Sequence, residues 1–129
     1  MSGSRIARVF DGDRDDPEVA PERAPLTDPH ERERVVEFLD GGRVLVAGGP
    51  LAPDLMDPAR PLEVPAGYAT DGTWIWSASL RYYVARHGLA PEPELLAHIR
   101  AHGYTPRTPT SAELTEAQED LHAFFRAAT

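Results

Sequence analysis

One stretch decides the fold: TDGTWIW at residues 70–76, followed directly by SASLRYYV at residues 77–84. It holds both tryptophans, two of the four tyrosines, a strong turn signal and the start of a helix. Asp-Gly between two apolar runs is the preferred pair for a two-residue type I′ hairpin turn, because both central residues need a positive φ. The stretch therefore predicts a β-hairpin that leads into a helix and forms the nucleus of the fold.

The turn type also predicts the hairpin register. With the Asp-Gly pair at the centre, Ala69 faces Trp74 and Gly67 faces Trp76. Side chains alternate between the two faces of a sheet, so both indoles share one face and lie opposite small residues. We expect Trp74 and Trp76 to form a platform in the core on which the helices pack.

Caps and apolar spacing predict four helices. They run from Asp28 to Gly41, from Ser77 or Ser79 to Gly88, from about Pro91 to Gly103, and from a Thr110–Glu113 capping box to the C-terminus. Tyr83 matches the buried stripe of the second helix, and Leu121 and Phe124 fall at helical spacing in the fourth. We expect these three side chains in the core.

The remaining segments complete an α+β fold. Residues 43–47 (RVLVA) predict a short buried strand, and residues 51–65 predict a proline-rich surface loop. Residues 1–26 are rich in Asp, Glu and Pro and predict a flexible acidic arm, in which residues 6–10 form a short strand or an anchor on the core. Residues 27–129 are then a single domain, with a small antiparallel sheet of about three strands packed against about four helices.

Composition narrows the function classes. The chain has 129 residues, no cysteine and a net charge of −8, and all 13 basic residues are arginine. The absence of cysteine excludes disulfides, thiolate metal sites and a cysteine nucleophile. The acidic charge argues against nucleic-acid binding and is compatible with a basic protein partner. No run of residues matches a signal peptide or a membrane span, so we expect a cytoplasmic protein.

Two patterns resemble metal sites only in part. Four acidic residues match positions of a calcium-binding loop, namely Asp11, Asp13, Asp15 and Glu22. The position that requires glycine is Asp16, which disfavours calcium. Glu94, His98 and His102 are spaced four apart on a predicted helix but lack the His-Glu-x-x-His order of a zinc protease. We therefore expect no metal and no cofactor.

The sequence patterns that would indicate catalytic residues are equally incomplete. Asp54 and Asp57 have the spacing of paired carboxylates, but the prolines around them favour a rigid surface loop. Ser77 and Ser79 are interpreted as helix caps, and no Gly-x-Ser-x-Gly elbow occurs.

A partner-binding surface is predicted beside the second helix. Adjacent residues on a helix point about 100° apart, so we expect Tyr82 to be exposed when Tyr83 is buried. Exposed tyrosine and arginine are enriched at binding hot spots. The predicted surface consists of Tyr82, Arg81 and Arg86, with Asp54 and Asp57 of the neighbouring acidic loop.

Three segments carry a resemblance to known proteins. TDGTWIW at residues 70–76, LRYYV at residues 80–84 and PELLAHI at residues 93–99 resemble a group of small uncharacterised actinobacterial proteins with an Asp-Gly-x-Trp-x-Trp hairpin and a Leu-x-Tyr-Tyr helix. The resemblance covers about residues 25–105. It implies an immunity protein, the small acidic partner of a secreted polymorphic toxin, and it implies no catalytic residues.

These observations lead to one functional hypothesis and two alternatives. The first is a non-enzymatic intracellular binding protein, in its narrower form an immunity protein that occludes a cognate toxin with a basic domain. The second is a small enzyme or ligand-binding domain that uses Asp71, His98 and His102. The third is an accessory subunit of a larger complex. No oligomeric state follows from the sequence.

Overall fold

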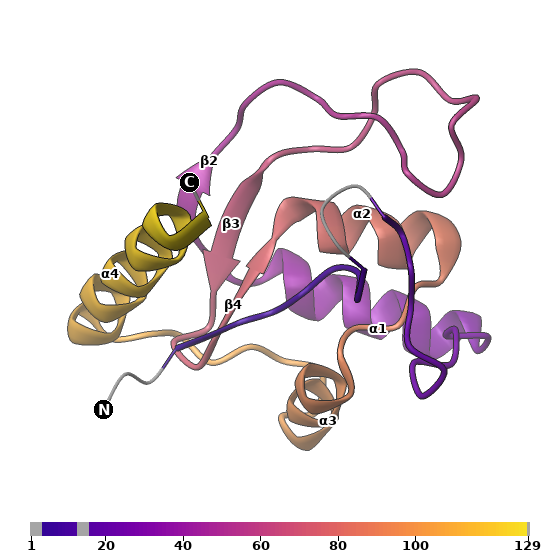
Figure 1. The fold of residues 1–129 in the computed structure, drawn as a ribbon. Coiled ribbons are helices and arrows are strands. Elements are labelled where there is room, and N and C mark those ends of the chain that lie inside the picture. Colours follow the sequence, from indigo (N-terminus) through magenta and orange to yellow (C-terminus); the bar gives the residue numbers. More distant parts are fainter. Residues whose placement is uncertain (1–3, 13–15, 129) are drawn as a thin grey trace.

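The fold is α+β, as predicted, in a computed structural model that describes residues 4–12 and 16–128. A four-stranded sheet in the order β1-β4-β3-β2 carries helices on both faces (Figure 1). The elements are β1 (Arg5–Ile6), α1 (Pro29–Asp40), β2 (Arg43–Ala47), β3 (Gly67–Thr70), β4 (Trp74–Ser77), α2 (Ala78–His87), α3 (Pro93–Ala101) and α4 (Ser111–Ala128). The sheet has one strand more than predicted and is mixed, because β1 pairs parallel to β4.

The predicted register of the β3–β4 hairpin is wrong by two residues. Ala69 faces Trp76, whereas a type I′ turn would place Trp74 there. Of the Asp-Gly pair only Gly72 has a positive φ, of 95°, so the turn is not type I′. Asp71 is instead the buried first residue of the turn, and its carboxylate binds backbone amides. A shift of two residues leaves each side chain on its predicted face, so Trp74 and Trp76 still share one face.

The helix starts follow the predicted caps. The side chain of Asp28 accepts a hydrogen bond from the backbone of α1, and that of Ser77 accepts one from α2. Before α4, Glu113 Oε1 accepts from the Thr110 amide at 2.9 Å, and Thr110 Oγ1 accepts from the Glu113 amide at 3.1 Å. This is the predicted capping box. Gly88, with φ of 70°, ends α2 in the left-handed conformation.

The two faces of the sheet have separate cores. Ile75 lies on the face covered by α4, where it packs with Ala117 and Leu121. The opposite face, with the two tryptophans, is covered by α1, α2 and α3 and holds the larger cluster. Figure 1 shows α4 alone on one side of the strands and the other three helices on the other side.

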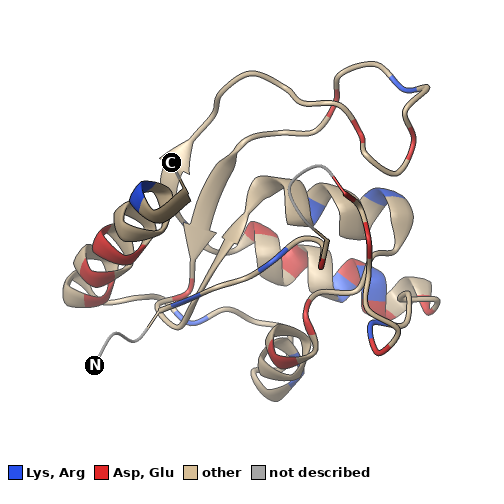
Figure 2. Cartoon of the chain, in the orientation of Figure 1, with Lys and Arg blue, Asp and Glu red and all other residues tan. Residues whose placement is uncertain are grey.

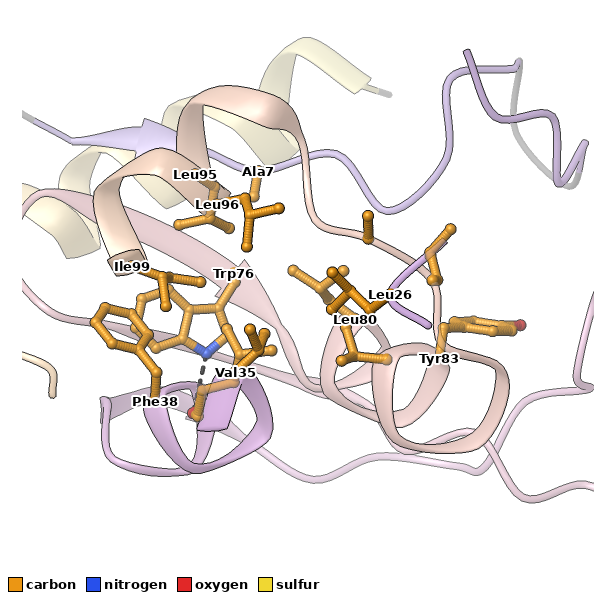
Figure 3. Close-up of a cluster of buried hydrophobic side chains, with 14 of the residues drawn as sticks. Ala7, Leu26, Val35, Phe38, Trp76, Leu80, Tyr83, Leu95, Leu96 and Ile99 are labelled. Carbon is orange, nitrogen blue, oxygen red and sulfur yellow. Dashed lines mark hydrogen bonds between the residues drawn. The ribbon is translucent and has the colours of Figure 1, made fainter. Parts of the chain in front are cut away.

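Trp76 lies at the centre of the larger core. Its indole Nε1 donates a hydrogen bond to the Leu39 carbonyl at 3.1 Å, and its ring centroid lies 5.6 Å from that of Phe38. Figure 3 shows Phe38 and Ile99 beside the indole. A Cβ atom at Gly42 would lie 2.5 Å from the indole Cζ2, so the chain between α1 and β2 passes close to the ring because residue 42 has no side chain. The predicted platform role of Trp76 is confirmed.

Four of the five predicted core residues are buried, and the fifth is not. The buried ones are Trp74, Trp76, Tyr83 and Leu121. Phe124 is 45% exposed, so its assignment to the core is wrong. The buried stripe of α4 advances by four residues at each step, from Ala117 through Leu121 to Phe125, and this spacing turns Phe124 towards the edge of the covered face.

The N-terminal segment contributes to the same core. Ala7 is buried, and its amide donates to a carbonyl of β4 next to the β1 pairing. Arg23 is only 4% exposed. Its guanidinium donates to the carbonyls of Val9 and Ala90 and lies 3.2 Å from Asp11 Oδ2. A buried arginine whose donors meet carbonyls and a carboxylate ties the segment to the chain around α3.

The strand at residues 43–47 is confirmed, but its predicted burial is wrong. β2 is an edge strand, with Val44 65% exposed and Val46 37% exposed. The pairing with β3 shifts by one residue between these two valines. On α4, Gln118 donates weakly to the Leu45 carbonyl at 3.5 Å. The hydrophobic residues of this segment predicted a buried strand. The strand order places β2 at the edge of the sheet, where its side chains are partly exposed.

Candidate functional site

Asp71 is fully buried in the hairpin turn and binds three groups. Its Oδ1 accepts hydrogen bonds from the amides of Thr73 at 3.0 Å and Trp74 at 2.9 Å. Its Oδ2 lies 2.6 Å from Nε2 of His98, on α3. The carboxylate therefore closes the turn and fastens α3 to the hairpin at the same time.

Asp54 has the same arrangement in the long loop between β2 and β3. Its Oδ1 accepts from the amides of Met56 at 2.8 Å and Asp57 at 3.1 Å. Its Oδ2 lies 2.7 Å from Nε2 of His87, the last residue of α2, and accepts from the Tyr82 hydroxyl at 2.8 Å. The side chain is fully buried. This carboxylate fastens the loop to α2.

Burial and hydrogen bonds around this turn shift the pKa values of three side chains, those of Asp54, Tyr82 and Tyr83. Burial raises the pKa of Asp54, but the hydrogen bonds from His87, Tyr82 and the Met56 amide outweigh it, so the net pKa lies below the ordinary 3.8. Burial, with the hydrogen bond to this carboxylate, raises the pKa of Tyr82. Burial also raises the pKa of Tyr83, whose hydroxyl accepts from the Leu55 amide at 2.9 Å. All three groups keep the loop against α2 at neutral pH.

Two of the predicted partner-binding residues point inward. Asp54 is 1% exposed, so the prediction that it contacts a partner is wrong. Its charge is satisfied inside the protein by two side chains and two amides, which the sequence pattern could not reveal. Tyr82 is half-buried because its hydroxyl binds this carboxylate, which leaves only part of the ring outside.

The other three predicted partner-binding residues are accessible but do not form one patch. Arg81 is exposed, and its guanidinium lies 2.9 Å from the carboxylate of Asp40 at the end of α1. Arg86 is exposed near Glu63, whose pKa it lowers together with Arg60, the larger cause. Asp57 is half-buried within the loop. The structure therefore divides the predicted surface between the two ends of α2.

The carboxylate and histidine residues of the enzyme hypothesis are brought together only in part. The rings of His98 and His102 lie 4.3 Å apart, and His102 is exposed. Within residues 4–12 and 16–128, no three His, Asp or Glu side chains are grouped as they would be around a metal ion. Glu94 pairs with Arg5, with 2.8 Å between Oε2 and Nη1.

The calcium-like pattern falls partly outside the structure. Asp13 and Asp15 lie outside the described residues. Asp11 binds the Ala20 amide at 2.6 Å and the Arg23 guanidinium at 3.2 Å, so its role in the described segment is to hold the N-terminal chain.

A shallow groove of about 320 Å³ lies on the sheet where the helices leave it uncovered. We call it the sheet groove. It is lined by Leu39, Asp40, Gly42, Val44, Val46, Ala47, Gly48, Pro65, Ala66, Gly67, Tyr68, Ala69, Trp76, Ala78 and Arg81. Most of these residues are small or apolar, and the Arg81–Asp40 pair lies at the rim. Such a surface can receive apolar side chains of another molecule, with hydrogen bonds and charges available around it.

Sequence reasoning found one residue of this groove, Arg81, and missed the rest. The available signal was the two small residues Gly67 and Ala69, which the predicted register placed opposite the indoles of Trp76 and Trp74. The exposure of Val44 depends on the position of β2 at the edge of the sheet, and this is a property of the topology.

The acidic residues of α4 form a separate feature next to β2. Figure 2 shows acidic positions along α4, with basic colour only near its C-terminal end. They are Glu113, Glu116, Glu119 and Asp120. At 100° per residue, Glu119 lies opposite the stripe of Ala117 and Leu121 that packs on the sheet, whereas Glu113, one turn before Ala117, and Asp120 lie beside that stripe. The acidic residues are therefore spread around the helix and do not form one outer face.

The described residues contain no recognisable hydrolytic pair. In the ranges that the structure covers, no serine or threonine hydroxyl hydrogen-bonds to a histidine. His87 and His98, both partly buried, instead have their Nε2 atoms bound to carboxylates.

Comparison with family models, with curated proteins and with solved structures found no match. Among helices of the described residues, none combines the length and apolar character that a membrane crossing requires.

Proposed function

We propose that this protein is a non-enzymatic binding protein, with the sheet groove and the open edge of β2 at the centre of its interface. One observation carries the proposal: the helices leave an apolar part of the sheet uncovered, with Val44 65% exposed at its edge. Apolar surface of this kind, bounded by polar residues, is typical of protein interaction sites. The open strand edge adds unpaired backbone groups that a partner chain can bind.

Charge supports a basic partner. The chain carries a net charge of −8, and α4 carries four acidic residues between positions 113 and 120. Val44, Ala69 and Trp76 of the sheet groove lie on the face of the sheet opposite α4, so the acidic residues of α4 add to the overall charge and do not line the groove. Electrostatic complementarity of this kind accelerates association and disfavours acidic competitors.

The narrower form of the proposal is an immunity protein that acts in the cytoplasm on a basic toxin domain. It rests on the acidic charge and on the resemblance at residues 70–99. The sheet groove would then receive an apolar side chain of the toxin, and Arg81 would exchange part of its contact with Asp40 for the partner.

The interface can be tested by placing a photo-crosslinking amino acid at Val44 in the producing cells. Leu62 is the matched control, since it is 59% exposed and does not line the groove. We expect residue 44 to yield one discrete adduct with a basic protein and residue 62 to yield none. Equal adducts at the two positions, or none at either, would contradict the proposal.

The immunity form needs a functional test with matched variants. Val44→Asp introduces a charge into the groove, and Leu62→Asp introduces the same charge elsewhere on the surface. If the adduct partner is toxic when expressed alone, the wild type and Leu62→Asp should protect cells and Val44→Asp should not. A partner without toxicity would refute the immunity form and leave the binding proposal standing.

The two alternatives from the sequence stay predictions. An enzyme that uses Asp71 and His98 would need substrate to reach a carboxylate that is fully buried and already binds two amides. An accessory subunit would give the same crosslink at residue 44, but with a permanent partner that is present in stoichiometric amount.

A further inference from the structure

A second concave site lies between the loop that joins β2 to β3, the N-terminal segment and α2. It is a cavity of about 350 Å³, within the range of about 300–1,000 Å³ that is typical of small-molecule sites. We call it the loop cavity. It is lined by Val9, Phe10, Ala52, Pro53, Leu55, Val64, Ser79 and Tyr83.

Three parts of the chain build the walls of the loop cavity: the N-terminal segment, the loop and α2. Ala52 and Val64 pair with each other and close the loop wall. The Leu55 amide donates to the Tyr83 hydroxyl, and Asp54 beside it fastens the loop to α2. Phe10 meets Tyr83 edge to face, with 4.9 Å between ring centroids. The cavity is thus enclosed by packed side chains on several sides.

The lining is mostly apolar and carries no charged side chain. A charged ligand would lose its hydration there without gaining a partner, which is strongly unfavourable. The lining therefore selects an uncharged, mostly apolar molecule.

Ser79 supplies a hydrogen-bonding group at the wall. Its Oγ lies 2.6 Å from Oγ of Ser77, which also accepts from the Leu80 amide as the cap of α2. If Ser77 donates to Ser79, the Ser79 hydroxyl is free to donate to a ligand. If Ser79 donates, its oxygen can still accept. A hydroxyl on the ligand can both donate and accept, so it matches either arrangement.

The cavity continues towards a second hollow of about 270 Å³ that shares Val9, Phe10 and Ser79 with it. An elongated ligand suits two hollows with common walls. Arg8 lines the second hollow, but its guanidinium lies 3.0 Å from the Glu92 carboxylate and is already paired. It is a poor attachment point for a free carboxylate.

We propose that the loop cavity binds an uncharged aliphatic molecule with a single hydroxyl group. The chain lies against Val9, Phe10 and Val64, and the hydroxyl meets Ser79 Oγ. The proposal is independent of the sheet groove, because the two sites share no lining residue.

The first test titrates the whole protein with 1-decanol and follows the backbone amide NMR signals. We expect saturable shifts at residues 9–10, 52–55, 64 and 79–83, with the signals of residues 44–47 unchanged. Decanoate, with the same chain and a charged end, should bind at least about tenfold more weakly. Absence of saturable shifts, shifts centred on the sheet groove, or equal binding of decanoate would each overturn the proposal.

Three variants locate the site. Ala52→Trp fills the cavity from an exposed loop position and should abolish decanol binding, whereas Leu62→Trp adds the same ring outside the cavity and should leave it unchanged. Ser79→Ala keeps the cavity open and should weaken decanol binding by about fivefold, the effect of one neutral hydrogen bond. Full affinity in both Ala52→Trp and Ser79→Ala would refute the assignment, and Ser79→Ala decides the matter if Ala52→Trp does not fold.

Discussion

Asp71 and Asp54 form two copies of one arrangement in different surroundings. Each carboxylate is buried, binds the amides two and three residues ahead with one oxygen, and binds a histidine on a helix with the other. Asp71 lies in a hairpin whose strands are hydrogen-bonded on both sides. Asp54 lies in a long loop in which Ala52 and Val64 form an isolated bridge.

The same contact therefore stabilises the whole fold at Asp71 and only one loop at Asp54. Opening the Asp71 turn exposes the core under Trp74 and separates α3 from the sheet, so it requires global unfolding. Opening the Asp54 turn releases the part of the loop around residues 54–57 from α2, while the hydrogen-bonded strands of the sheet stay paired. The loop is also the wall of the proposed ligand cavity, so its lower local stability provides a way in.

The largest expected effect is that of Asp71→Ala. The substitution leaves two buried turn amides and His98 without their acceptor, and we expect a loss of about 3 kcal/mol in the free energy of unfolding. Urea unfolding followed by tryptophan fluorescence measures it. Asp71→Asn keeps one acceptor oxygen and should lose clearly less. A change below about 1 kcal/mol in Asp71→Ala would break the comparison, because the hairpin would then not depend on this contact.

Asp54→Ala should have a smaller global effect with a strong local one. We expect about 1.5 kcal/mol, because the released Met56 and Asp57 amides can reach water once the loop opens. Limited proteolysis should cut the variant within residues 55–63 much faster than the wild type, with no new cuts in α1 or α4. Faster cutting throughout the chain would show that the loop is not an independent unit.

The sequence predicted the elements better than their surroundings. Caps such as Asp28 and the Thr110–Glu113 box determine helix ends locally, so they are readable without the fold. The register of the hairpin was wrong because the preferred Asp-Gly turn competes with burial of Asp71 against His98, a residue 27 positions away in the chain. Contacts of that kind leave no local pattern in one sequence.

The pH dependence of the free energy of unfolding provides a further test of the contacts of Asp54. Its pKa in the folded protein lies below 3.8, so its contribution is present above that pH and is lost as the pH falls towards the folded value. The stability difference between the wild type and Asp54→Asn should therefore shrink below pH 4. Comparing the two proteins cancels the parallel loss from Glu31, whose pKa the Arg100 hydrogen bond lowers to about 2. A difference that grows with acid would contradict the assigned direction.

The smallest effect is expected for Tyr82→Phe. It removes one of the two donors to Asp54 Oδ2 while His87 stays bound, so we expect a loss of less than about 1 kcal/mol. Urea unfolding gives the global value, and proteolysis within the loop should rise only slightly. An effect as large as that of Asp54→Ala would mean that Tyr82, and not His87, is the main anchor of the loop.

The candidate sites were less predictable than the core. The partner surface was inferred from residue types. Arg81 is exposed, as that inference requires, whereas Asp54 is buried because its partners come from α2, more than 25 residues later. The sheet groove and the loop cavity consist mostly of alanine, valine, glycine and proline. In a sequence, such residues do not indicate a binding site. They form concave surfaces only because of how the strands and the loop are arranged.

Native-state hydrogen exchange tests the central claim most directly, because it compares the two carboxylates in one sample. The amides of Thr73 and Trp74 bind Asp71, and those of Met56 and Asp57 bind Asp54. We predict that the first pair exchanges only through global unfolding, with a free energy that falls as urea is added. The second pair should exchange through a local opening of lower free energy that urea hardly changes. Equal free energies with equal urea dependence at the two sites would contradict the account.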